Sequence, residues 1–586
     1  MRRSLYVLVS SLALVASFLL IIGFSGSGKA QEPDRVMGAR NSEKRARESL
    51  RVVVTPWGPT QDAIDAARIS TASRPEVLRY LKGTNHRLLH FELIESDSKS
   101  ASQNPPTRFL ATFYDYTNNR TVRAAGSFDS PGALKLSTSD DQMVPSEEEF
   151  QAALKILEGD QIFGGALRSG ELKTYPPMPP VLYPDKSGRR VERTIYVGVR
   201  PSGSSGFNNE IVGVNMIRET VIRYKKGAPP TSRATVDDCG VPSAGQSTTA
   251  NGTAGQYQFT VIDTGGFEVW SFLAIRPSAS SGATGERSGI ELRDVKYRGK
   301  SVLKRIHTPI LNVKYDNDAC GPFRDWQYQE GMFQATGTDV PGTNGGVRDC
   351  GANIATTALE TGNDTGNFKG IAFYRENNEL VLVSEMNAGW YRYIAEYRLA
   401  DDGAIRPRYG YGATINSCVC LDHHHHVYWR MDFDIGTGGN SITLGSLSGR
   451  SLSQETKMWR FANARQLNFL ISNVATGDAY MLRPNNNDGT AYDGSANPYG
   501  RGDVWLLQYK SSGGSPIEID DPNTNSQANI DPWVNGESIA NQDIVIWYGG
   551  HFDHLQTSSF SETIFNRPHI LKGDHVQGPD LIPYRW

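Results

Sequence analysis

The stretch Leu421–Gly436, LDHHHHVYWRMDFDIG, places four consecutive histidines before an aromatic run that closes with two aspartates. Its hydrophobic and aromatic residues predict a β-strand, and a strand directs alternate side chains to opposite faces. His423 and His425 therefore share one face, and two imidazoles two residues apart can reach one transition-metal ion. For the histidines taken alone, a solvated polar run that binds metal adventitiously is an equal alternative.

The composition is that of a folded, β-rich protein. With 586 residues the chain is too long for one ordinary domain. Its 59 glycines and 30 prolines, together with many threonine, valine and aromatic residues, favour strands joined by turns and long loops. The net charge is −3 and no basic cluster follows the first residues, so nucleic acid is not expected as a partner.

The N-terminus has the features of an export signal. Arg2 and Arg3 precede an apolar run, and small residues end at Ala30, a suitable cleavage point. The sequence therefore predicts a secreted or periplasmic protein with residues 1–30 as signal peptide. The run is long enough that an uncleaved membrane anchor is an alternative. Outside the cytoplasm, the five cysteines can form disulfides with at least one thiol left over.

The expected fold class is mainly β, a large antiparallel β-sandwich preceded by two small α+β modules. Residues 31–60 are polar and charged, and are expected to form a flexible leader. The segments 61–145 and 146–230 each combine a helical pattern with alternating strands. Residues 231–255, rich in Pro, Gly, Ser and Thr, predict a linker. From 256 to 586 many short strands and no long helical period predict the sandwich.

A second histidine motif lies near the C-terminus. The stretch 536–556, GESIANQDIVIWYGGHFDHLQ, offers His551 and His554 after a hydrophobic strand. Together the two stretches resemble the catalytic domain of the copper-containing, topaquinone-dependent amine oxidases. That family has a histidine-x-histidine pair, and a third ligand after a strand of the form aspartate, three hydrophobics, tryptophan. The resemblance implies that His423, His425 and His554 bind copper, with His551 as an off-pattern neighbour.

The same resemblance gives the aspartates a role. It implies that Asp432, Asp434 and Asp543, with the backbone carbonyls of Phe433 and Ile544, hold a structural cation, usually calcium. Hard oxygen ligands suit such an ion, as imidazoles suit copper. Strand alternation directs the first two acids away from the copper-binding histidines, so one β-layer would carry two metals on its two faces. For the acids alone, a solvated sheet edge is the alternative.

The stretch 387–405, NAGWYRYIAEYRLADDGAI, resembles the family segment in which a tyrosine is converted to topaquinone by copper and oxygen. Tyr391 falls at the precursor position. Trp390 stands where the family has asparagine, Arg392 where it has an acid, and Asn387 where it has threonine. The expectation is that Trp and Arg beside the ring would block the amine or retune the quinone. An ordinary buried tyrosine beside copper is the alternative.

Upstream, the stretch 310–333 resembles the family segment that carries a tyrosine and, after it, the catalytic aspartate. Tyr315 matches the tyrosine that hydrogen-bonds the quinone oxygen. Glu330 falls near the position of the aspartate, with Asp325 as a substitute. A glutamate can act as a general base, and burial beside a quinone is expected to raise its pKa toward the working range. A solvent-facing Glu330 is the alternative.

The resemblance covers residues 65–586 and implies a function. A primary amine would be oxidised to an aldehyde, with release of ammonia and hydrogen peroxide. Copper, topaquinone from Tyr391 and calcium would be the cofactors, a small primary amine and oxygen the partners, and a homodimer the assembly. The sandwich would be of the amine-oxidase supersandwich type, preceded by cystatin-like modules. The family's usual disulfide partner of Cys350 is absent from this chain, and Cys320 is the candidate partner instead.

Two rival functions follow from the altered motif around Tyr391. The first is a copper-binding relative that has lost quinone chemistry and acts as a secreted binding protein. The second is a different copper–oxygen chemistry that leaves the tyrosine unmodified. Trp390 and Arg392 are the residues that favour the first.

Overall fold

The structure is a computed structural model. Of the residues after the N-terminal 49 it describes 50–94, 104–130, 132, 134–140, 142–177, 191–202, 206–224, 240–244, 253–282, 287–315, 323–416, 418–419, 421, 423–459, 468–484, 503–512, 515–516, 530–554, 563–564, 567–568 and 576–586. The predicted signal peptide and most of the predicted linker lie outside these residues. No helix in the described ranges is long and apolar enough to span a membrane.

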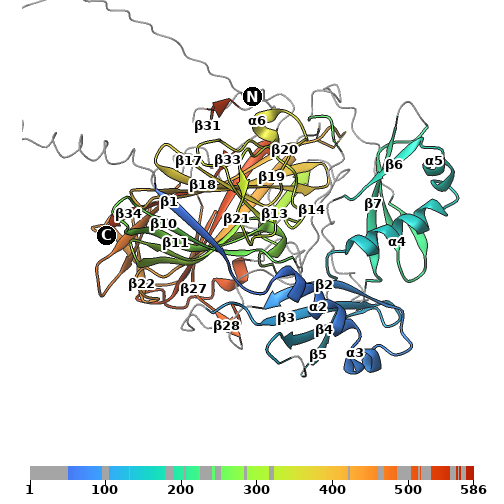
Figure 1. The fold of residues 1–586 in the computed structure, drawn as a ribbon, viewed down its shortest axis with the longest axis horizontal. Coiled ribbons are helices and arrows are strands. Elements are labelled where there is room, and N and C mark those ends of the chain that lie inside the picture. Colours follow the sequence, from blue (N-terminus) through green and yellow to red (C-terminus); the bar gives the residue numbers. More distant parts are fainter. Residues whose placement is uncertain are drawn as a thin grey trace, which may run out of the picture. The chain divides into compact units, whose positions relative to one another are not determined.

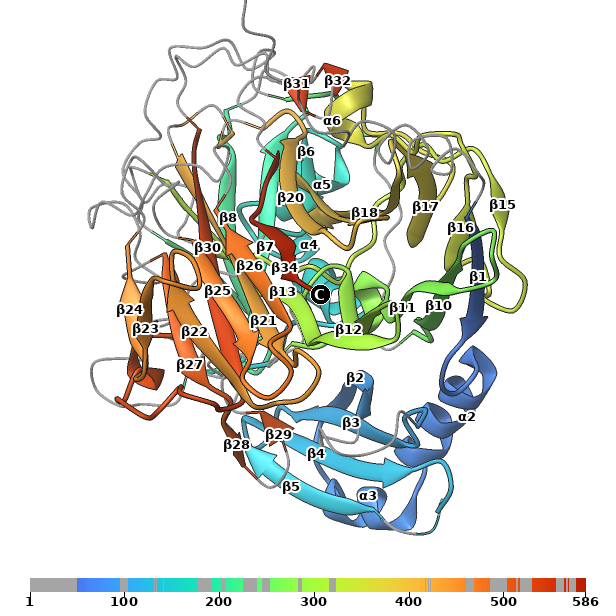
Figure 2. The ribbon, with the colours of Figure 1, turned by 90° about the vertical axis from the view of Figure 1, so that its left-hand side faces the viewer.

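A first helix-and-sheet unit follows residue 60. Thr60 caps the first helix by accepting a hydrogen bond from the Ala63 amide. Apolar residues of the two helices and the sheet, among them Ile64, Val77 and Phe113, form its own core. Figure 2 shows the four strands in blue with the helices beside them. Its elements are α2 (Gln61–Ala72), α3 (Pro75–Tyr80), β2 (His86–Ile94), β3 (Arg108–Asp115), β4 (Arg120–Ser127) and β5 (Lys135–Ser139).

A second unit repeats this combination. Ser146 caps its long helix by accepting from the Glu149 amide, and three acids in the first turn complement the helix dipole. The buried ion pair between Glu149 and Arg193 ties this helix to the sheet, with Nη2 2.5 Å from Oε2. The elements are α4 (Glu147–Glu158), α5 (Gly164–Arg168), β6 (Leu172–Tyr175), β7 (Thr194–Pro201), β8 (Glu210–Asn215) and β9 (Thr220–Arg223).

The first large sheet brings the two histidine motifs together. Among the described residues it has ten strands in the order β1–β10–β11–β12–β13–β21–β30–β27–β24, with β14 beside β13. Strand β21 therefore pairs on one side with β13 and on the other with β30, both antiparallel. The bounds are β1 (Arg51–Pro56), β10 (Gln256–Ile262), β11 (Glu268–Ile275), β12 (Glu291–Tyr297), β13 (Lys300–Tyr315), β14 (Phe323–Arg324), β21 (His423–Phe433), β24 (Thr456–Met458), β27 (Val504–Gln508) and β30 (Ile544–His554).

The second large sheet carries Tyr391. Among the described residues it has twelve strands in the order β15–β16–β17–β18–β19–β20–β34–β26–β25–β22–β23, with β33 beside β20. The bounds are β15 (Thr338–Asp339), β16 (Val347–Asp349), β17 (Ile371–Glu376), β18 (Glu379–Ala388), β19 (Tyr391–Ala400), β20 (Ile405–Ala413), β22 (Asn440–Leu444), β23 (Arg450–Leu452), β25 (Phe469–Asn473), β26 (Ala479–Arg483), β33 (Val576–Gln577) and β34 (Asp580–Arg585). Smaller elements are η2 (Pro277–Ala279), α6 (Ala358–Thr361) and η4 (Asp531–Trp533), and the strand pairs β28–β29 (511–512, 515–516) and β31–β32 (563–564, 567–568).

The facing sides of the two large sheets form one hydrophobic core. In Figure 1 green strands β10 and β11 belong to the first sheet and yellow strands β17 and β18 to the second. Leu303 and Val313 enter it from the first sheet, and Leu382 and Leu399 from the second. Two antiparallel sheets that bury one face each against the other make a β-sandwich. The predicted fold class, mainly β with a large antiparallel sandwich after two small α+β units, is confirmed.

One expectation about the leader does not hold. Residues Arg51–Pro56, placed by composition in a flexible leader, form strand β1 and pair antiparallel with β10 at the edge of the first sheet. Three consecutive valines explain this, because β-branched residues favour the extended backbone and Val52 and Val54 pack on the main core. The predicted boundaries of the modules and linker stay predictions.

Candidate active site

Strand pairing places histidines that are distant in sequence opposite each other in the first sheet. In the register of β21 with β30, His423 lies directly opposite His554 and His426 opposite His551. On the other side of β21, His423 lies opposite Tyr315 of β13. The side chains of His423 and His425 are fully buried in the sandwich core. The side chain of His554 lies outside the described atoms, so the pairing locates its backbone alone.

The two buried imidazoles are both held through Nδ1. His423 Nδ1 lies 2.5 Å from the Leu421 carbonyl oxygen, which can only accept, so this nitrogen carries the proton. His425 Nδ1 lies 3.2 Å from the hydroxyl of Tyr393, which itself donates to the Asp325 carboxylate and therefore accepts from the imidazole. Each ring then presents Nε2, and the outer hydrogen bond fixes its tautomer as in protein metal sites. The pair fits a copper ion.

Tyr391 lies against these imidazoles. It opens β19, and its ring centroid is 4.6 Å from that of His425 and 5.9 Å from that of His423. Its phenol oxygen is 2.5 Å from that of Tyr315, so the residue expected to hydrogen-bond the quinone oxygen does contact Tyr391. Burial raises the pKa of Tyr391 well above its ordinary value, while hydrogen bonds from Tyr315 and Trp390 oppose that rise.

Arg392 and Tyr391 point to opposite faces of β19, which corrects one expectation. Arg392 forms a two-pronged ion pair with Asp364, at 2.6 and 2.9 Å, and donates to the backbone carbonyl of Tyr391 at 2.9 Å. It lies opposite Asn387 in the register with β18, on the face of the second sheet that is turned away from His425. The guanidinium therefore does not stand beside the phenol, where it was expected to hinder the amine.

The carboxylate of Glu330 is not available for its expected role as general base. Its buried carboxylate is held by the Arg276 guanidinium, with Nε 2.8 Å from Oε1, and by the amide and hydroxyl of Ser278 at 3.1 and 2.9 Å. Burial alone would raise the pKa of Glu330, but Arg276 and Ser278 hold it below its ordinary value. The expectation of a raised pKa is wrong, because the ion pair outweighs desolvation.

Asp325, the substitute, lies among the phenols instead. Its carboxylate accepts the hydroxyl proton of Tyr393. Burial is the main cause of the raised pKa values of Tyr391, Tyr315 and Tyr409, and the negative charge of Asp325 raises them further. The tertiary structure thus brings one buried carboxylate close to the tyrosine cluster and the His425 imidazole.

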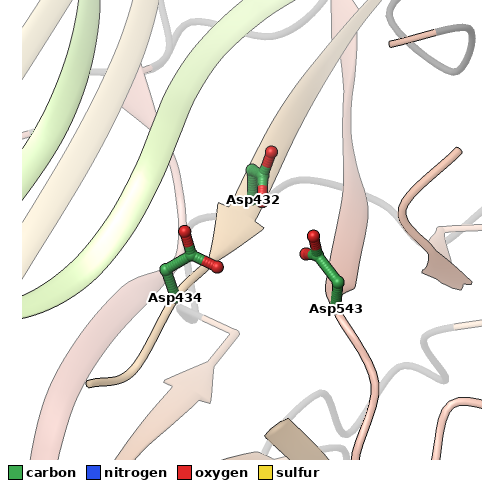
Figure 3. A group of neighbouring side chains, drawn as sticks. All are labelled: Asp432, Asp434 and Asp543. Atoms are coloured by element: carbon green, nitrogen blue, oxygen red, sulfur yellow. The ribbon is translucent and has the colours of Figure 1, made fainter. Parts of the chain in front are cut away.

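The acidic motif converges as expected. One carboxylate oxygen from each of Asp432, Asp434 and Asp543 lies within 4.8 Å of the other two. Figure 3 shows the three side chains around a common space, two from the end of β21 and one from the residue before β30. Phe433 and Ile544, the predicted carbonyl ligands, lie directly opposite each other in the same strand pair. The set suits a hard cation such as calcium.

The remaining histidines of the run face the other side of the sheet. His426 Nδ1 lies 3.0 Å from His551 Nδ1, and His551 Nε2 lies 3.0 Å from an Asp503 carboxylate oxygen. All three residues are buried. His551, the off-pattern neighbour, therefore belongs to a chain of contacts from Asp503 to His426 on the face opposite Tyr391.

Three contacts were not expected from the sequence. Tyr393 links Asp325 to His425, Tyr411 stacks on His425 with ring centroids 3.9 Å apart, and Tyr175 of the second small unit packs edge-on against Trp390 at 5.8 Å. The alternation of Tyr409 and Tyr411 along β20 is a signal that both face one side. No local signal marks Tyr175, which lies more than 200 residues before Trp390.

The cysteines differ from the expected pairing. Cys350 is a free, buried thiol, so its predicted disulfide with Cys320 is wrong. Burial raises the pKa of the Cys350 thiol to about 11, which makes it unreactive. Cys418, close to the start of β21, is disulfide-bonded.

Sequence comparison alone finds no relative, since no family model and no curated protein match the chain. Solved structures do resemble it. A copper-containing benzylamine oxidase from Hansenula polymorpha has a TM-score of 0.55 at 12% identity, covering 90% of this chain and 97% of that one. An amine oxidase from Aspergillus nidulans has 0.53 at 14%, covering 90% and 88%. Pichia pastoris lysyl oxidase has 0.53 at 13%, covering 86% and 85%. These similarities establish the fold.

Proposed function

We propose that this chain, which has the β-sandwich fold of the copper amine oxidases, oxidises a primary amine to an aldehyde with oxygen. The reaction takes up one water and one oxygen molecule, and releases ammonia and hydrogen peroxide. The observation that carries the proposal is the buried phenol of Tyr391, which contacts Tyr315 and the His425 ring at the place where the two histidine motifs meet.

Copper is the first cofactor of this proposal, and His423, His425 and His554 would hold it. When bound, copper supplies the redox chemistry with oxygen that converts a tyrosine to topaquinone. The chain contributes two imidazoles preset to present Nε2, in a core from which water is excluded. Conversion of Tyr391 adds two oxygen atoms to the side chain and removes two hydrogens.

The proton-transfer role is assigned to Asp325 in preference to Glu330. A general base must reach the proton next to the amine nitrogen and have its carboxylate available. Glu330 is engaged by Arg276 and Ser278. Asp325 lies within electrostatic range of Tyr391, and Tyr393 fixes its orientation. In this assignment Asp325 accepts the proton, and Tyr315 holds the oxygen of residue 391.

Further parts of the proposal rest on the sequence. Calcium is proposed for the site of Asp432, Asp434 and Asp543, where it would tie the end of β21 to the start of β30. A secreted or periplasmic location is proposed from the N-terminal apolar run. An uncleaved membrane anchor is the alternative. The proposed homodimer rests on the family resemblance.

The test is the mass of the peptide that contains Tyr391. Purified protein is incubated with copper in air, and the peptide should gain two oxygens less two hydrogens, together with a positive redox-cycling stain. Tyr391→Phe is the negative control for the stain. An unmodified peptide in protein that has bound copper would instead support the copper-binding relative without quinone chemistry. Peroxide formation that needs no amine would indicate a different copper–oxygen chemistry.

A further inference from the structure

The indole of Trp390, the residue that replaces the family's asparagine, is wedged into the phenol cluster. Its Nε1 donates to the hydroxyl oxygen of Tyr315 at 3.1 Å, and that oxygen is 2.5 Å from the phenol oxygen of Tyr391. All three side chains are at most 2% exposed. An indole N–H can only donate a hydrogen bond, so Trp390 is a donor to this pair of oxygens.

The position of the indole is fixed from two sides. The backbone carbonyl of Trp390 accepts from the Thr414 amide at 2.7 Å, which anchors the turn between β18 and β19 to the end of β20. The ring of Tyr175, from β6 of the second small unit, packs edge-on against the indole with centroids 5.8 Å apart. Tyr175 is itself held, since its hydroxyl donates to the Asn209 side chain at 2.9 Å. The indole therefore has little freedom to turn its N–H away from Tyr315.

From this geometry we propose that Trp390 is a positioning residue for Tyr391: its N–H, braced by Tyr175, fixes the Tyr315 hydroxyl and through it the orientation of the Tyr391 ring. The inference rests on the proposed function and deepens it. It assigns the second small unit a part in the site, because that unit supplies the brace. Trp390 thus places an N–H donor at the sequence position where the family has asparagine.

Positioning of this kind has a chemical consequence for residue 391. A hydrogen bond at the phenol oxygen restrains the tilt of the Tyr391 ring, which stands edge-on to His425, and ring oxidation requires that one of its two equivalent edges face the metal site. A donor near the phenol oxygens also stabilises negative charge on them, which burial disfavours. Removal of the N–H should therefore loosen the ring and slow its conversion, while leaving the fold in place.

The first experiment observes the ring without any metal. 3-Fluorotyrosine is incorporated at position 391 of the full chain, and ¹⁹F NMR spectra are recorded on copper-free protein. The parent chain should give narrow resonances, at most one for each of the two positions that the fluorine takes when the ring flips. Trp390→Phe, which keeps an aromatic ring against Tyr175 but lacks the N–H, should give broadened resonances. An unchanged spectrum would overturn the proposal.

A matched control separates positioning from general damage. Trp270 is as deeply buried in the same core, and its Nε1 donates to the Ala400 carbonyl at 2.9 Å, away from the phenols. Trp270→Phe should leave the fluorine resonance of residue 391 narrow. If both substitutions alter it equally, the effect is one of packing and the proposal fails.

The second experiment measures conversion of Tyr391 by peptide mass over time after copper addition. Trp390→Phe should slow it about tenfold, the effect of one buried hydrogen bond, and Trp390→Asn should restore part of the rate. Equal rates in the parent and Trp390→Phe would contradict the proposal. If the parent chain is not converted at all, the proposed function fails, and the fluorine spectra still decide whether Trp390 orients the ring.

Discussion

His423 and His554 lie directly opposite each other in the β21–β30 pair, although 130 residues of sequence lie between them. The pairing also places Tyr315 beside His423 from the other neighbouring strand. A cross-strand neighbour is the closest approach that a sheet offers to two distant residues. The metal site proposed here is therefore a property of strand order and register.

Copper binding should depend on the inward-facing histidines alone. His423→Ala and His425→Ala should each weaken copper affinity at least about 100-fold, since each removes a ligand rather than its support. His424→Ala, on the opposite face of the same strand and partly exposed, is the matched control. Competition titration against a chelator gives the affinities. Equal losses of copper affinity in all three variants would contradict the proposed copper site.

Tyr393→Phe tests the support of His425. The variant removes the hydroxyl that accepts from His425 Nδ1 and donates to Asp325, so the imidazole loses its orientation. Copper affinity should fall by about 10- to 100-fold. Tyr409→Phe removes a hydroxyl from the same cluster that bonds Gln327 instead, and should leave the affinity unchanged. A Tyr393→Phe protein that binds copper normally would show that the contact has no such role.

Calcium should stabilise the chain through the acidic trio. Thermal unfolding with and without calcium should show a higher Tm in its presence, with a gain of about 2.7 kcal/mol when calcium is at 100 times its Kd. Asp543→Asn should abolish the calcium-induced shift, because it removes one of three converging carboxylates. Asp62→Asn, an exposed position in α2, should retain it. A parent chain insensitive to calcium would contradict the assignment.

The Arg392–Asp364 pair should matter for stability. Arg392→Leu leaves the buried Asp364 carboxylate without its guanidinium partner and should cost about 3–5 kcal/mol in the free energy of unfolding. The double variant Arg392→Leu with Asp364→Leu should recover much of that loss. Urea unfolding measures both. A double variant no more stable than the single one would show that the charge left behind is not the cause.

Glu385 should make stability fall as pH rises. Burial raises the pKa of this carboxyl from 4.5 to about 8, against an opposing hydrogen bond from the Ala358 amide. Between those pH values the folded state keeps a proton that the unfolded state releases, so stability declines by at most about 1.4 kcal/mol per pH unit. Above pH 8 the decline ends.

Glu385→Gln should flatten that pH dependence, because the amide cannot ionise. The comparison is the free energy of unfolding at pH 5 and pH 8 in the parent and the variant. Glu268→Gln, an exposed glutamate at the start of β11, serves as control and should follow the parent. Parallel pH profiles for the parent and Glu385→Gln would contradict the raised pKa.

Much of the arrangement of the histidines and aspartates was predictable from local patterns. Alternation along a strand predicts that His423 and His425 point one way and Asp432 and Asp434 the other. The ring contacts of His425 with Tyr391 and of His426 with His551 agree with alternating faces. The pairing of the phenols of Tyr391 and Tyr315 was also expected. In each case the relation depends on spacing within one strand or on a motif, which the linear sequence records.

The general base and the surroundings of Tyr391 were not predictable in the same way. Glu330 and Asp325 are five residues apart, and sequence spacing favoured the one that turns out to be held by Arg276. Arg392 was expected beside the phenol because it is adjacent in sequence, although strand alternation already argues for opposite faces. Its partner Asp364 comes from a loop that no local pattern connects to β19.

The sequence by itself determined the β-sandwich class and the strand patterns of the histidines and aspartates, because each depends on alternation or short-range spacing. Only the tertiary structure decided that Asp325 lies among the phenols and that Tyr175 packs against Trp390. It also decided that His426 contacts His551. Those outcomes depend on contacts between segments far apart in the chain, and a side chain's protonation and reach are set by such neighbours rather than by its own position in the sequence.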